Sequence, residues 1–167
     1  TYFGLEITNM FLTKKIPTLS KKEINQHFVL AKDNISKRAL KILHRNGDFF
    51  NNVFVFLLKD TYMQPHLHPG YQKKEKMFLF RGSFCLLFFN DNGKVVKKTL
   101  LDHKKKNYFE IPPFTWHTYV MTSENVVIYE TMNGIYNPKT WKKMANWAPK
   151  ENSRQAKYYL KKLKTYA

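Results

Sequence analysis

Short apolar runs separated by turn residues dominate the chain from residue 49 onward. Their lengths of four to seven residues and their spacing are typical of an all-β sandwich or barrel. The expected strands cover residues 53–58, 77–80, 84–89, 95–101, 108–111, 116–121 and 126–131. Several runs are apolar at successive positions, which indicates strands covered on both faces. The Asn-Asp-Asn-Gly sequence at residues 90–93 predicts a hairpin between two of these strands.

Helical signals flank this β region on both sides. Between positions 20 and 43, apolar residues recur at helical spacing at Ile24, Phe28, Ala31 and Ile35. Ser20 followed by Glu23 has the form of a capping box and predicts a helix that begins near Lys21. Residues 153–163 are rich in helix formers and predict a terminal helix that packs on the barrel.

The chain is expected to fold as one domain. Hydrophobic residues make up 43% of its 167 residues, enough for a sizeable core without disulfide bonds. We interpret residues 1–48 as a helical or irregular N-terminal extension, 49–136 as the barrel, and 137–167 as a C-terminal segment that carries the helix. Cys85, the single cysteine, lies in an apolar run and is interpreted as a buried hydrophobic residue.

The formal charge of +17 raises nucleic acid as a partner, but the composition disfavours it. The basic residues are mostly Lys, scattered along the whole chain, whereas phosphate and base recognition favours the Arg fork. An anionic small molecule remains compatible with this charge. No apolar run approaches the roughly 18 residues of a membrane span, and the start lacks a signal-peptide layout. We therefore expect a soluble, cytoplasmic protein.

Three of the six histidines fall in two short elements. His66 and His68 are two residues apart, so on a strand both imidazoles point to the same face. Glu75 adds a carboxylate a few residues later, and His117 opens another expected strand. Three imidazoles and one carboxylate form a ligand set that suits one divalent ion, Zn, Fe, Mn, Co or Ni.

These residues resemble the two motifs of the cupin superfamily. The first motif has the order His, any residue, His, Glu and Gly, which is matched by His66, His68, Glu75 and Gly82. In the second motif Pro precedes His, as Pro112 precedes His117 here, and Phe114 stands where Gly is usual. The resemblance implies a double-stranded β-helix, the jelly-roll barrel. It also implies that His66, His68, Glu75 and His117 bind the metal ion.

A narrower resemblance covers most of the chain and is to the WbuC family of cupin-fold metalloproteins. That family is found with genes for bacterial O-antigen and related surface polysaccharides, and the resemblance implies this setting rather than a reaction. The residues in the family's order outside the cupin motifs include Arg38, His44, Tyr62, Arg81, Glu130, Tyr136 and the Trp147-Ala148-Pro149 sequence.

Three hypotheses about function follow. The first is a metal-dependent isomerase or epimerase that acts on a sugar or nucleotide sugar, in which Glu130 or His44 moves a proton. The residues expected to bind its anionic carbohydrate ligand are Arg38, Tyr62, Arg81, Tyr129 and Tyr136. The second is an Fe(II)-dependent dioxygenase, and the third is a non-catalytic sugar-binding module braced by the metal. A homodimer, formed through sheet edges or the N-terminal residues, is a further expectation.

Overall fold

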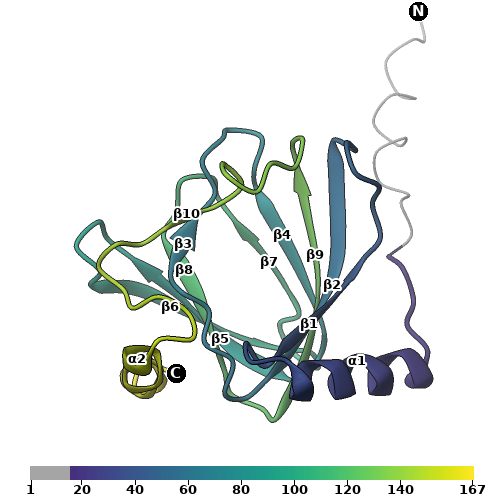
Figure 1. Ribbon diagram of the computed structural model, residues 1–167, viewed down its shortest axis with the longest axis horizontal. Coiled ribbons are helices and arrows are strands. Elements are labelled where there is room, and N and C mark those ends of the chain that lie inside the picture. Colours follow the sequence, from purple (N-terminus) through teal and green to yellow (C-terminus); the bar gives the residue numbers. More distant parts are fainter. Residues whose placement is uncertain (1–15) are drawn as a thin grey trace, which may run out of the picture.

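Two five-stranded antiparallel sheets face each other in the computed structural model, which describes residues 16–167 (Figure 1). The first sheet has the order β1-β2-β9-β4-β7 and consists of Arg38–Ile42, Phe50–Leu58, Asn125–Asn133, Glu75–Arg81 and Tyr108–Ile111. The second has the order β10-β3-β8-β5-β6 and consists of Lys143–Met144, His66–Leu67, His117–Met121, Ser83–Phe89 and Val95–Asp102. This arrangement confirms the predicted jelly-roll barrel.

All seven predicted strands are present, and three short strands were not predicted. The hairpin at residues 90–93 joins β5 to β6, with Gly93 at a φ of 76°. The additional strands β3 and β10 have two residues each, too few to show a pattern. β1 pairs with β2 and lies inside the expected N-terminal extension, so the sheet begins before residue 49. The part of that extension before residue 16 lies outside the described residues.

The core between the sheets is built by alternate residues of each strand. Val55 and Leu57 of β2 pack there against Leu86 and Phe88 of β5 and other inward-facing apolar residues. The intervening residues of β2, Phe54 and Phe56, are fully buried on the opposite face of the same sheet. Burial of both faces explains why these strands show continuous apolar runs.

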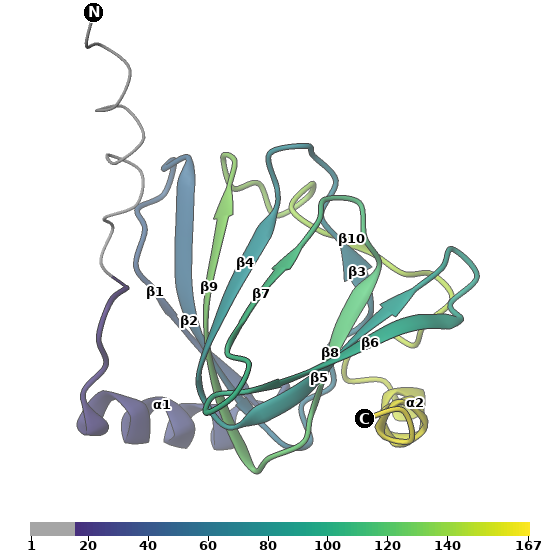
Figure 2. The ribbon, with the colours of Figure 1, turned by 180° about the vertical axis from the view of Figure 1, so that it is seen from behind.

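A helix covers the outer face of each sheet (Figure 2). α1, Lys21–Asp33, begins at the predicted capping box and packs Phe28 and Ala31 onto the first sheet. α2, Arg154–Lys164, packs Leu160 and Leu163 onto the second sheet, where Cys85 is also buried. Within residues 16–167, neither helix is long and apolar enough to cross a membrane.

Gly82, between β4 and β5, occupies a position that accepts no side chain. Its φ is +83°, and a Cβ there would lie 2.3 Å from the carbonyl oxygen of Asn125. We expect Gly82→Ala to lower the free energy of unfolding by about 3 kcal/mol, because backbone strain and a steric clash add. Gly47 has a φ of +89° with nothing within 4 Å, so Gly47→Ala should cost only about 1 kcal/mol. If urea unfolding showed the same loss of free energy of unfolding for Gly82→Ala and Gly47→Ala, the steric explanation would be contradicted.

Candidate metal centre

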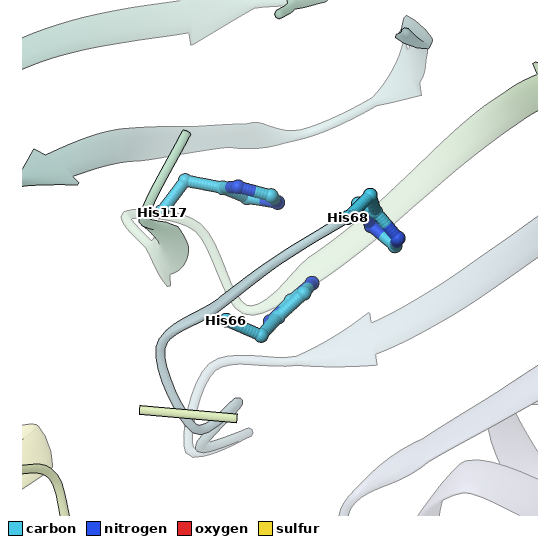
Figure 3. A group of neighbouring side chains, drawn as sticks. All are labelled: His66, His68 and His117. Atoms are coloured by element: carbon cyan, nitrogen blue, oxygen red, sulfur yellow. The ribbon is translucent and has the colours of Figure 1, made fainter. Parts of the chain in front are cut away.

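Three buried histidines from two segments of the chain form a cluster inside the barrel. His66 of β3 is the direct cross-strand partner of His117 of β8, and His68 follows β3 on the same face. One ring nitrogen from each residue lies within 4.8 Å of the others. Figure 3 shows the three imidazoles turned toward a common space.

Backbone carbonyls determine which nitrogen of each ring faces this space. The Nδ1 atoms of His66, His68 and His117 lie 3.0, 2.9 and 2.8 Å from the carbonyl oxygens of Gln64, Trp141 and Thr115. A carbonyl oxygen only accepts hydrogen bonds, so each Nδ1 carries a proton, and in the neutral ring Nε2 is then the atom with a free lone pair. Burial also lowers the pKa of His66 well below its ordinary value, which favours the neutral ring.

Glu75, the first residue of β4, brings a carboxylate to the same space. Its Oε2 lies 3.2 Å from Nε2 of His68 and 3.3 Å from Nε2 of His117. Burial raises the pKa of Glu75, but the two neighbouring imidazoles outweigh burial and hold this pKa well below its ordinary value. The Oε2 atom and the Nε2 atom of His117 are buried without a hydrogen-bond partner among the described residues.

These orphaned atoms fit a metal ion. When the rings are in the neutral form that binds metal, their lone pairs and an ionised carboxylate converge without protons between them, which is costly in a buried site unless a cation lies there. The donor set of three nitrogens and one carboxylate oxygen suits a first-row divalent ion. The carbonyls that hold each Nδ1 proton supply the outer-shell hydrogen bonds that orient metal-binding histidines.

The turn before β8 positions His117 with unusual backbone geometry. Phe114 has a φ of 59°, the left-handed region in which the cupin motif has Gly. Its backbone N–H donates to the carbonyl oxygen of His68 over 3.0 Å, which links the two histidine-bearing segments. The turn therefore keeps the geometry that the motif requires although the residue is not Gly.

A second buried carboxyl group lies next to the cluster. The hydroxyl of Tyr119 donates to Oε1 of Glu75 over 2.5 Å and lies 3.3 Å from Oε1 of Glu130. Burial, together with the negative charge of Glu75, raises the pKa of Glu130 to about 8. Glu130 thus carries a proton at neutral pH and can exchange it near neutrality, as a general acid or base must.

The cluster lies beside a cavity of about 440 Å³. Of the predicted site residues, the structure brings to its wall His68 and Glu75 of the ligand set together with Arg38, His44, Glu130 and Tyr136. The backbone N–H of Asn52 lies 3.0 Å from Nδ1 of His44 and holds the His44 ring in place. The Arg38 guanidinium is engaged by the carboxylate of Glu151 at 2.5 Å.

Three predicted ligand-binding residues lie outside this cavity. Tyr62 is buried on the outer side of the second sheet, where its hydroxyl donates to the carbonyl oxygen of Pro149. Arg81 lies with its guanidinium 5.7 Å from the ring of Phe28 of α1. Tyr129 lies on the outer face of the first sheet, in the apolar cluster that includes Phe28 of α1, because it and Glu130 are adjacent on one strand and so point to opposite faces.

Sequence analysis did not select four residues that the structure places at the site. They are Tyr119 beside Glu75, and Asn51, Trp141 and Lys142 in the cavity wall. Tyr119 could have been found, since it is two residues after His117 and thus on the same face of β8. Asn51, Trp141 and Lys142 carry no local sequence signal, because their position in the cavity wall depends on which strands and loops come together in the fold.

Removing the Tyr119 hydroxyl should weaken metal binding. Tyr119→Phe is nearly isosteric and leaves Oε1 of Glu75 without its buried donor. We expect the dissociation constant for Zn(II) to rise about 10- to 100-fold, as for other outer-shell partners. The matched control is Tyr62→Phe, which removes a buried hydroxyl on the outer side of the barrel. Competition with a chromophoric chelator measures both variants, and equal affinities would contradict the role of Tyr119.

The barrel has the cupin fold, and its group of three buried histidines could bind a metal ion. A sequence model of a domain of unknown function, DUF6016, matches residues 19–101, which include His66, His68 and Glu75 but not His117. No curated protein matches this chain in sequence.

Solved structures with the same fold include CapF, at a TM-score of 0.54 and 15% identity over 63% of this chain and 31% of CapF. A second CapF structure, described as a capsular polysaccharide assembling protein of Staphylococcus aureus, has a TM-score of 0.50 and 14% identity over 64% and 31% of the chains. Protein SO0799 of Shewanella oneidensis has a TM-score of 0.53 and 9% identity, over 66% of this chain and 75% of SO0799. Oxalate decarboxylase has a TM-score of 0.51 and 13% identity, over 64% of this chain and 28% of the decarboxylase. This chain thus spans about a third of CapF, and the similarity extends to the fold alone.

Proposed function

We propose that this protein is a metal-dependent cupin that acts on a sugar or nucleotide sugar as an isomerase or epimerase. The observation that carries this proposal is the convergence of three Nε2 lone pairs and the Glu75 carboxylate beside a cavity that also holds Glu130. A ligand set and a titratable carboxyl group at one cavity are the parts that metal-assisted proton transfer requires.

His66, His68, Glu75 and His117 would hold the metal ion, which when bound polarises a hydroxyl or carbonyl oxygen of the ligand. Oε1 of Glu130 would transfer the proton: the ionised carboxylate takes a proton from carbon and the protonated form returns it, and a pKa of about 8 keeps both forms accessible near neutral pH. Tyr119 holds Glu75 and Glu130 in a fixed relation, and burial keeps its pKa well above the ordinary value. The Tyr119 hydroxyl therefore remains a donor.

The setting that we propose is the biosynthesis of bacterial surface polysaccharides. It is supported by the resemblance to the WbuC family in the residues outside the general cupin motifs. CapF, a fold neighbour, is described as a capsular polysaccharide assembling protein, and this chain spans about a third of it. The cavity wall is largely apolar and also carries polar, aromatic and basic residues, a combination that suits the C–H surface and the hydroxyl groups of a carbohydrate.

Incubation of the metal-loaded protein in D₂O with a panel of nucleotide sugars and sugar phosphates tests this proposal. We expect deuterium to enter one sugar C–H position, detected by NMR, because Glu130 exchanges its proton with solvent. Binding without exchange would favour the non-catalytic sugar-binding module. Oxygen uptake with Fe(II) but not with Zn(II) would favour the dioxygenase. The proposal would be abandoned if no compound bound or exchanged.

A further inference from the structure

We propose that the cavity binds a hydroxylated anion, of the class of sugar acids and sugar phosphates, with Lys142 holding the anionic group and Asn51 accepting a hydrogen bond from a hydroxyl. This inference rests on the proposed function and names its ligand class. It also assigns the anionic group to Lys142 rather than to Arg38 or Arg81, the basic residues named in the prediction.

Among residues 16–167, Lys142 is a cavity-wall cation without a charged partner. It follows Trp141 in the loop that lines the cavity before β10, and it is exposed. In the described part of the chain its ammonium group has no hydrogen-bond or ion-pair partner. Its positive charge acts on both Glu130 and His66, so it lies within electrostatic reach of the cluster. An anionic ligand group beside the cluster would therefore meet an unpaired ammonium.

Arg38, the other cation predicted here, is already neutralised. Its Nη2 lies 2.5 Å and its Nη1 3.3 Å from the two carboxylate oxygens of Glu151, a bidentate pair. The same carboxylate accepts from the backbone N–H of Gln64, which anchors it. A ligand anion would have to compete with this pair, whereas Lys142 has no competing partner.

Asn51 contributes a buried acceptor that no described residue satisfies. It is 6% exposed and faces the cavity from β2, on the same face as Val53. Its Nδ2 donates to the carbonyl oxygen of Gly134 over 2.5 Å, which sets the orientation of the amide. Its Oδ1 is buried without a partner. An unmet buried acceptor costs free energy, and a ligand hydroxyl that donates to it would recover that cost.

An aromatic wall lies next to these two polar groups. Tyr136 and Trp141 form an edge-to-face pair with ring centroids 5.3 Å apart, and both line the cavity. The Lys73 ammonium lies 4.9 Å from the centroid of Trp141 and donates to the carbonyl oxygen of Thr140, which anchors this loop. Aromatic faces pack well against apolar C–H surface, so this wall suits the C–H face of a sugar ring.

The experiment is calorimetric titration of the Zn(II)-loaded protein at low ionic strength. The probes are D-glucose, D-galactose and D-mannose, each with its uronic acid and its 1-phosphate, so that carboxylate and phosphate are tested separately. We expect at least one anionic form to bind about tenfold or more tightly than its neutral parent. Lys142→Met should abolish this preference, whereas the matched control Lys143→Met, whose ammonium lies near the Trp116 ring, should keep it.

Asn51→Ala supplies an independent test of the hydroxyl contact. This variant should lower the affinity for the neutral and the anionic sugars by the same factor, because both carry the hydroxyl. Its melting temperature should match that of the wild type, which shows that the variant is folded. Neutral sugars that bind as tightly as their acids, or a preference that survives Lys142→Met, would overturn the inference and leave the proposed function intact. Failure of all nine compounds to bind would count against both.

Discussion

His117→Ala should abolish specific metal binding. His117 is fully buried, and its Nε2 is an orphaned atom of the cluster. Loss of an outer-shell partner typically costs 10- to 100-fold in affinity, so loss of a direct ligand should cost about 1000-fold or more. Metal that binds only the folded state adds about 4 kcal/mol at a concentration 1000 times its dissociation constant. EDTA should therefore lower the melting temperature of the wild type but not of the variant.

His103→Ala is the matched control. His103 is a histidine whose Nδ1 also contacts a backbone carbonyl, that of Gly82, but it lies outside the cluster. Its loss should leave the Zn(II) dissociation constant unchanged. If His117→Ala bound Zn(II) within tenfold of the wild type, the cluster would not be the metal centre.

Glu130→Gln should change how the stability of the metal-free protein depends on pH. The pKa of Glu130 is about 8 in the folded protein, raised by burial and by Glu75, against an ordinary value of 4.5. The folded state therefore binds this proton more tightly than the unfolded chain does. The resulting stabilisation is complete below pH 4.5 and is lost as the pH rises through about 8. The wild type should lose about 3 to 5 kcal/mol relative to Glu130→Gln over this range.

Urea unfolding in EDTA at several pH values between 5 and 9 measures this difference. Glu110→Gln is the control, because the Tyr108 hydroxyl and nearby lysines lower the pKa of Glu110 and place its titration below this range. Saturating Zn(II) should reduce the effect, since the positive ion offsets the charge of Glu75. Parallel pH profiles for wild type and Glu130→Gln would show that Glu130 is not protonated in the folded state.

Local sequence signals determined most of the secondary structure. Apolar runs between turn residues identified seven strands, and the capping box at Ser20 identified the start of α1. These signals suffice because they depend on neighbours along the chain. The two-residue strands β3 and β10 carry no such signal, since only their partners across the sheet make them strands.

The spacing of His66 and His68 was enough to predict that they share a face, because side chains alternate along an extended chain. Only the tertiary structure decided that His117 pairs with His66, that Tyr129 lies in the cluster on the outer face of the first sheet, and that Glu151 neutralises Arg38. Each of these outcomes depends on contacts between residues far apart in the sequence. The sequence by itself determined the barrel and the candidate ligands, and long-range packing decided which charges and polar atoms near them remain free for a ligand.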